Sequence, residues 1–213
     1  IANTADVVMA DVAGASLKLN ASETIGSLSG GGTTGGNVFL QTFTLTTGDA
    51  GNDTYAGVIS GSGGLIKAGA GILTLSGANN YTGTTSVSAG TLKLGAAGVI
   101  ADASAVSLAG TLDLNGNDET VGSIAGAGTV TSGVAGTKTL TAGGDNTDTT
   151  FSGAIQNGSG TVGLTKAGTG TLTLSGTNTH TGTTTINSGT IALSGGAAIA
   201  NSGAVVISDA ANT

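Results

Sequence analysis

The stretch GLIKAGAGILTLSGANNYTGTTSVSAGTLKL occupies residues 64–94, and GLTKAGTGTLTLSGTNTHTGTTTINSGTIAL occupies residues 163–193, at a constant offset of 99 residues. Counting the matching letters of the two segments gives 19 identities in 31 positions. An enzyme rarely needs its scaffold in duplicate, whereas a solenoid gains length with each unit that stacks on its neighbour. The repetition therefore favours an elongated repeat protein.

Short apolar triplets recur inside and outside these segments, each with one variable residue at its centre. Leu73, Leu92 and Leu112 open three successive triplets at nearly equal intervals along the chain. Because side chains alternate between the two faces of a strand, the apolar residues should face inward and the central residue outward. Glycines flank the triplets, where tight corners would need positive φ at little cost; they are Gly71, Gly77, Gly90, Gly110, Gly170, Gly176 and Gly189.

This alternation of strands and corners predicts an all-β fold, a right-handed parallel β-helix with about 19–20 residues per turn and negligible helix. Equivalent strands of successive turns would stack about 4.8 Å apart. The right hand follows from the general preference of parallel crossover connections.

A longer period organises the chain as one continuous solenoid. IANTADVVMAD at 1–11 resembles IADASAVSLAG at 100–110 and IANSGAVVISD at 199–209. We therefore expect two tandem super-repeats, at about 1–99 and 100–198, with residues 199–213 as the start of a third. Each super-repeat should form five turns.

The composition excludes several classes of function. The chain of 213 residues has a net charge of -7 and no Arg, which disfavours binding to nucleic acids or to anionic lipid. No apolar run approaches the roughly 20 residues of a membrane-spanning helix. The chain has no Cys, which leaves the redox compartment undecided and fits export equally well.

The phrase from Gly63 to Gly83, followed by the T-x-V-x-x-G-T-L-x-L pattern at 85–94, resembles the passenger-associated transport repeat, also called the autotransporter-associated β-strand repeat. The resemblance implies a right-handed β-helical passenger domain, exported across the outer membrane of a Gram-negative bacterium and displayed on the cell or secreted. Such passengers are often adhesin stalks or self-associate. The resemblance implies no catalytic residues.

The two copies share a set of positions that we interpret as structural. His180 stands where the other copy has Tyr81, so a ring that fills a turn is a better explanation than a catalytic base or metal ligand. Lys67 and Lys166 are expected at a solvated corner or as caps of local carbonyls. The whole set is Lys67, Gly71, Leu73, Leu75, Gly77, Asn79, Tyr81 and Gly83 in one copy, and Lys166, Gly170, Leu172, Leu174, Gly176, Asn178, His180 and Gly182 in the other.

Two kinds of binding site are weaker alternatives. Carboxylates and amides before Tyr55 and Phe151 could supply oxygens to calcium, although they are also ordinary turn formers; these candidates are Asp49, Asn52, Asp53, Asp145 and Asp148. Alternating threonines at 42–46 and 177–185 could bind ice. The second run also contains Asn, His and Gly, which suggests a bend rather than a plane.

We therefore predict a non-enzymatic extracellular scaffold without cofactors, a stalk or fibre segment of a bacterial surface passenger. Its acids are dispersed, and no Ser-His-Asp set or metal triad is present in the sequence. The expected partners are neighbouring repeats, or further copies stacked end to end into a filament. A solenoid that binds ice, calcium or glycan is the alternative of another class.

Overall fold

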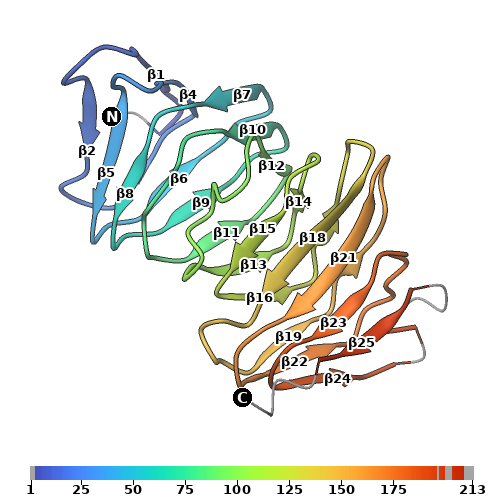
Figure 1. Ribbon diagram of the computed structural model, residues 1–213. Coiled ribbons are helices and arrows are strands. Elements are labelled where there is room, and N and C mark those ends of the chain that lie inside the picture. The colour runs from blue at the N-terminus through green and yellow to red at the C-terminus, as the bar shows by residue number, and fades with distance from the viewer. Residues whose placement is uncertain (1–2, 196, 200–202, 209–213) are drawn as a thin grey trace.

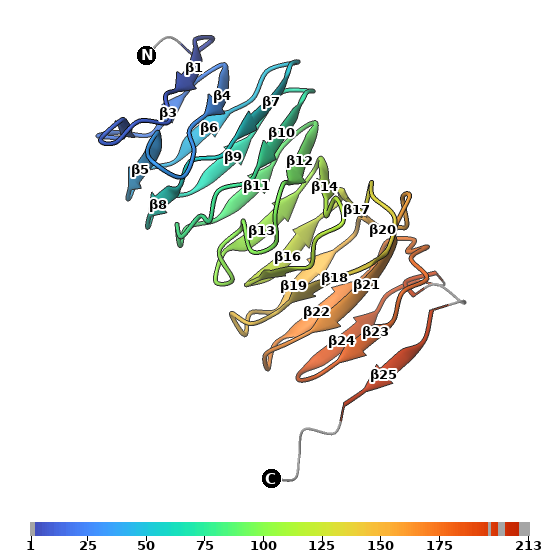
Figure 2. The ribbon, with the colours of Figure 1, turned by 45° about the horizontal axis from the view of Figure 1, so that its top comes forward.

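The computed structural model describes residues 3–195, 197–199 and 203–208, which form a β-solenoid of about 9 turns (Figure 1). The strands stack as parallel ladders along the axis, with the N-terminal turns at one end and the C-terminal turns at the other (Figures 1 and 2). The described residues contain no helix. The predicted parallel solenoid is therefore confirmed.

Each turn runs along three sides, of which two are continuous sheets. The eight-stranded sheet consists of β1 (Asp6–Met9), β4 (Ser27–Gly30), β7 (Asn52–Tyr55), β10 (Ile72–Leu75), β12 (Thr91–Leu94), β14 (Thr111–Asp113), β17 (Thr129–Thr131) and β20 (Ala154–Ile155). The nine-stranded sheet consists of β3 (Glu23–Thr24), β6 (Leu45–Thr47), β9 (Leu65–Lys67), β11 (Thr85–Val87), β13 (Ala105–Leu108), β16 (Ser123–Gly126), β19 (Thr149–Phe151), β22 (Thr171–Leu174) and β24 (Thr190–Leu193).

The third side, which we call the divided side, holds two shorter sheets. The three-stranded sheet consists of β2 (Ser16–Lys18), β5 (Asn37–Gln41) and β8 (Ile59–Gly61). The five-stranded sheet consists of β15 (Glu119–Val121), β18 (Thr137–Ala142), β21 (Thr161–Lys166), β23 (Thr184–Ile186) and β25 (Val205–Ile207). Between β8 and β15 the chain crosses this side twice without forming a strand, at residues 79–82 and 98–100.

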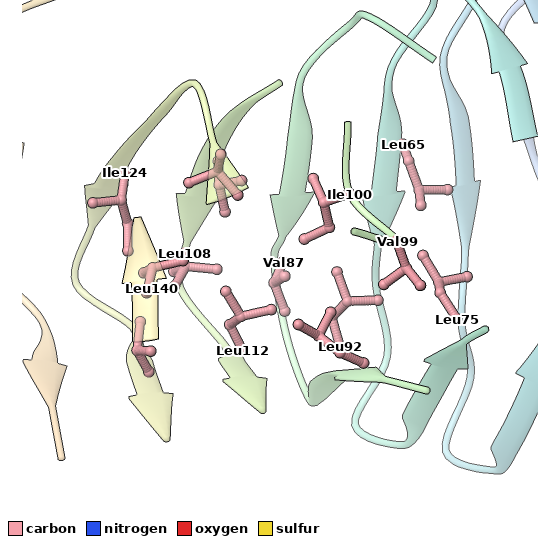
Figure 3. Packing of buried hydrophobic residues seen from close by; sticks show 14 of the residues in the cluster. Leu65, Leu75, Val87, Leu92, Val99, Ile100, Leu108, Leu112, Ile124 and Leu140 are labelled. Atoms are coloured by element: carbon pink, nitrogen blue, oxygen red, sulfur yellow. The ribbon is translucent and has the colours of Figure 1, made fainter. Parts of the chain in front are cut away.

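Apolar side chains from the three sides meet in a single core along the axis. Leu65, Val87, Leu108 and Ile124 come from successive turns of the nine-stranded sheet, and Leu92 and Leu112 face them from the eight-stranded sheet (Figure 3). These side chains are buried, while the central residues of the triplets are exposed or half-buried. The predicted alternation is therefore confirmed.

The turns vary in length more than the sequence indicated. Ile72 pairs with Thr91, and Thr91 pairs with Thr111, so these two turns have the predicted length. The next turn, from Thr111 to its partner Thr129, is slightly shorter, whereas the following one, from Thr129 to Ala154, is clearly longer. The extra residues extend strands on the divided side and the loops that flank them, so the stack continues without interruption.

The two super-repeats are rotated relative to each other by one side of the coil. The strand β9 lies in the nine-stranded sheet, but its equivalent in the second super-repeat lies within β21 of the five-stranded sheet. Likewise β10 lies in the eight-stranded sheet and its equivalent β22 in the nine-stranded one. From β9 to β21 the chain makes four turns (β9, β11, β13, β16, β19) and two further sides (β20, β21). A super-repeat thus spans four and two-thirds turns, not the five expected.

Most corner glycines are needed for space rather than for positive φ. Gly90 and Gly189 do have positive φ, 62° and 68°. The other five predicted positions do not, and a Cβ there would collide with backbone of the preceding turn. At Gly71 the obstacle is the carbonyl of Gly51, and at Gly77 it is the carbonyl of Gly57. Turns stacked at strand spacing leave no room for a side chain at these corners.

Candidate functional site

Lys67 and Lys166 lie at equivalent corners, where both side chains are buried and their ammonium groups cap carbonyls. The Nζ of Lys67 donates to the carbonyls of Ala68, Gly69 (3.0 Å) and, in the next turn, Ala89 (3.4 Å). Lys166 donates in the same pattern to Ala167, Gly168 (2.9 Å) and Ser188 (3.5 Å). The lysines therefore cap local carbonyls, which was one of the two alternatives. The other alternative, a solvated corner, is wrong, because Lys67 is 1% and Lys166 0% exposed.

Burial lowers the pKa of both lysines, and nearby carboxylates oppose this effect. Asp49 and Asp53 favour the charged form of Lys67, and Asp145 and Asp148 favour that of Lys166. At each corner the lysine Nζ is held by carbonyl oxygens of two consecutive turns.

Asn79 and Asn178 add side-chain hydrogen bonds to the few backbone ones where the chain crosses a side without a strand. The Oδ1 of Asn79 accepts from the backbone N–H of Ile59 in the turn before (2.8 Å), and its Nδ2 donates to the carbonyl of Val99 in the turn after (2.8 Å). Asn178 bridges Ile155 (2.7 Å) and Ala198 (2.5 Å) in the same way. One amide side chain therefore links three consecutive turns.

The rings of Tyr81 and His180 fill the interior beside these asparagines. The hydroxyl of Tyr81 is 2.6 Å from that of Thr85, which is 2.9 Å from the hydroxyl of Ser104. His180 Nε2 is 2.9 Å from the hydroxyl of Thr184, whereas its Nδ1 has no hydrogen-bond partner. Burial lowers the pKa of His180, and its 1% exposure leaves no route for a substrate. The ring fills the same place as Tyr81.

The oxygens predicted as weak calcium ligands bind backbone N–H groups. Asp49 Oδ1 accepts from Gly51 (2.6 Å), and Asn52 Oδ1 from Ile72 in the next turn (3.1 Å). Asp145 Oδ1 accepts from Thr147 (3.0 Å), and Asp148 Oδ1 from Thr171 in the next turn (2.7 Å). Burial and the charge of Asp49 raise the pKa of Asp53.

Among residues 3–195, 197–199 and 203–208, no three His, Asp or Glu side chains form a group that could hold a metal ion. Calcium binding at these positions, which would have to use backbone and amide oxygens as well, stays a prediction.

Glu119 is a buried residue that the sequence reasoning missed. Its Oε2 accepts from the N–H of Gly98 (2.9 Å) and its Oε1 from the N–H of Ile100 (2.8 Å), both in the strandless crossing of the turn before. Burial raises its pKa to about 7, although these hydrogen bonds favour the charged form. The sequence did contain a signal for this role: Glu119 aligns with Glu23 when segment 112–126 is matched to segment 17–30.

These contacts define what the arrangement does chemically. Lysine, asparagine and glutamate atoms bind the backbone of adjoining turns and converge on no shared point. The geometry therefore ties one turn to the next, in both copies of the motif and on different sides of the coil.

Replacing Lys67 with Met should lower the free energy of unfolding by about 3 kcal/mol. Methionine keeps the apolar stem but leaves three half-buried carbonyls without this donor, at about 1 kcal/mol each. Urea unfolding monitored by circular dichroism measures the change. Lys93→Met, at a half-buried outward position of β12, is the matched control. Equal unfolding free energies for the two variants would contradict the capping role.

Glu119→Gln should alter the pH dependence of stability. Because the folded pKa of about 7 exceeds the ordinary value of 4.5, the folded state holds this proton more tightly than the unfolded chain. The contribution of Glu119 is therefore full below pH 4.5 and is lost as the pH rises through 7. The glutamine variant should lack this loss, as measured by urea unfolding between pH 4 and about 8. The same pH profile in both proteins would show that Glu119 does not titrate in this range.

The comparisons with known proteins agree with this geometry. The family model of the passenger-associated-transport-repeat matches residues 65–94 and 164–193. No curated protein and no solved structure has significant similarity to the chain. The described residues contain no helix long and apolar enough to span a membrane. The two segments whose lysine and asparagine side chains link adjoining turns are thus two copies of the passenger-associated-transport-repeat, carried on one β-solenoid.

Proposed function

We propose that this chain is a non-enzymatic stalk segment of an extracellular bacterial passenger, which holds other parts of the protein away from the cell. One observation carries the proposal: the polar side chains that the two repeat copies share bind the backbone of neighbouring turns. The repeated sequence therefore serves the continuity of the coil, which a spacer requires.

The mechanism of such a stalk is geometric. At about 4.8 Å per turn, about 9 turns give a rod of roughly 40 Å. Since each turn contacts only its neighbours, stability accumulates along the axis, and the chain can fold turn by turn as it emerges. The absence of Cys and Pro suits passage through a narrow pore before folding.

The repeat family supports export to the surface of a Gram-negative bacterium. We further propose that the rod takes part in adhesion through its tip or its sides. Contact between cells or with a host would then depend on surfaces that the stalk presents at a distance from the membrane.

A filament built from copies of the chain is the second candidate. Leu193 and Ile207 are 55% and 76% exposed on the last described turn, whereas Leu94 and Leu108, at equivalent positions, are buried. A further turn, from the same chain or from another copy, would cover these side chains. The repeated sequence at 1–11 and 199–209 is compatible with a further turn from the same chain and with one from another copy. Of these two segments, residues 1–2, 200–202 and 209 lie outside the described part.

Immunolabelling of intact cells of the native host tests the proposal. An antibody against this chain should label intact cells, and protease added outside should remove the label, whereas a cytoplasmic control protein should remain hidden. Labelling that appears only after permeabilisation would overturn surface display. Electron microscopy of the purified chain separates the two candidates, because single short rods support the stalk and long fibres support the filament.

A further inference from the structure

The outward face of the five-stranded sheet carries a regular array of threonines. Thr120 pairs with Thr141, Thr141 with Thr165, and Thr165 with Thr185, so four threonines stack in register across β15, β18, β21 and β23. These four strands lie side by side in the yellow-green to orange part of the solenoid (Figure 1). We call this line the central row.

Further threonines flank the central row on the same face. Thr139 lies level with Gly163, and Thr137 with Thr161, two and four residues before the central row. Thr183 precedes Thr184, which pairs with Leu164, so Thr183 lies level with Gly163 and two residues before Thr185. Together these positions form a grid with spacings of about 4.8 Å across the strands and about 6.6 Å along them. In the flanking row Gly163 leaves a gap, and Asp118 lies level with Thr139 at the edge. We call the grid the threonine array.

The chemistry of the threonine array is uniform. Each position offers one methyl and one hydroxyl group, and branching at Cβ restricts the side-chain rotamers. Packing against neighbours in the row leaves the central threonines half-buried, which further fixes them. No charged or aromatic residue interrupts the central row from Thr120 to Thr185.

The central row is a rigid, uncharged line of hydroxyl and methyl groups, which fits a ligand that is itself a hydrogen-bonded lattice. Ionic ligands would find no counter-charge on the central row, and sugar rings would find no aromatic side chain to stack on. Water molecules held at regular spacing can hydrogen-bond to the hydroxyls and fill the space between methyl groups. Because the array is already ordered in the fold, little conformational entropy is lost on binding.

We propose that the threonine array binds the surface of ice crystals. This activity does not rest on the stalk function, since it depends only on one side of the described coil. The threonine array could not be recognised in the alternating threonines of residues 177–185, because most of that run lies outside a strand. Only Thr184 and Thr185 of the run belong to β23. The members of the array come from four different turns and align only through the strand register.

The other super-repeat supplies an internal comparison. The positions equivalent to the central row are Thr24, Thr46, Ile66 and Ser86, which also stack in register but in the nine-stranded sheet. Isoleucine and serine break the threonine pattern there, while the buried positions of β9 and β11 keep the residue types of their equivalents in β21 and β23, apart from valine in place of isoleucine at the end of β11. The array is therefore a property of the second super-repeat and not of the fold.

Thermal hysteresis and adsorption of the fluorescently labelled chain to a growing ice surface test the proposal. The unaltered chain should lower the freezing point below the melting point and should coat the ice. Thr165→Lys, at the centre of the array, should reduce both effects at least about tenfold by placing a charge on the lattice. Thr74→Lys, at a half-buried outward position of β10 in the eight-stranded sheet, is the matched control and should leave them unchanged.

Thr165→Val is measured alongside in case the lysine variant fails to fold, and circular dichroism checks both. Valine keeps the shape and removes the hydroxyl, so it should also weaken adsorption, although less than lysine. Absence of hysteresis and of ice adsorption in the unaltered chain would overturn the proposal. So would equal activity of the unaltered chain and folded Thr165→Lys. Binding to crystalline cellulose without any effect on ice would overturn it as well and would indicate a polysaccharide ligand.

Discussion

The structure depends on one constraint: the backbone of each turn must form hydrogen bonds with the turns before and after it, because there is no other layer on which it could pack. Strand ladders meet this requirement along most of the coil. Where a side is crossed without a strand, buried N–H and C=O groups would be left unpaired at a cost of about 1–3 kcal/mol each. Asn79, Asn178 and Glu119 supply the missing partners at those crossings. The asparagine of the repeat motif can therefore be understood as a residue needed where a ladder stops.

The mismatch between the repeat and the turn has consequences for the surface. A super-repeat of four and two-thirds turns places equivalent segments on different sides, so three super-repeats in succession would bring a segment back to its starting side. Core positions are interchangeable between sides, since β10 and β22 bury the same Leu-x-Leu pattern. Outward positions are free to diverge, as Ile66 and Thr165 do. One core pattern thus supports sides of different chemistry.

The fold could be predicted from the sequence because the alternation of Leu with variable residues, and its regular recurrence once per turn, follow directly from strand geometry. Two features could not be predicted from the sequence: the lengths of the turns 111–129 and 129–154, and the rotation between the super-repeats. Both depend on how the corner loops absorb insertions. The place of His180 in the repeat indicated a ring that fills a turn, whereas for Lys67 it left a solvated corner and a cap of local carbonyls as alternatives. Glu119 and the threonine array were missed because their partners lie one or more turns away. The division of the chain at residues 99 and 198 and the proposed partners stay predictions.

The central claim is that a side chain supplies the hydrogen bonds that the backbone leaves unmade at the strandless crossings. Amide hydrogen exchange of Ile59 tests it directly, because this N–H donates to Asn79 Oδ1 in the next turn. Asn79→Ala should accelerate exchange at Ile59 by at least about tenfold while the rest of the coil stays folded. Asn80→Ala, the exposed neighbour, should leave that exchange rate unchanged. Equal protection of Ile59 in both variants would contradict the account.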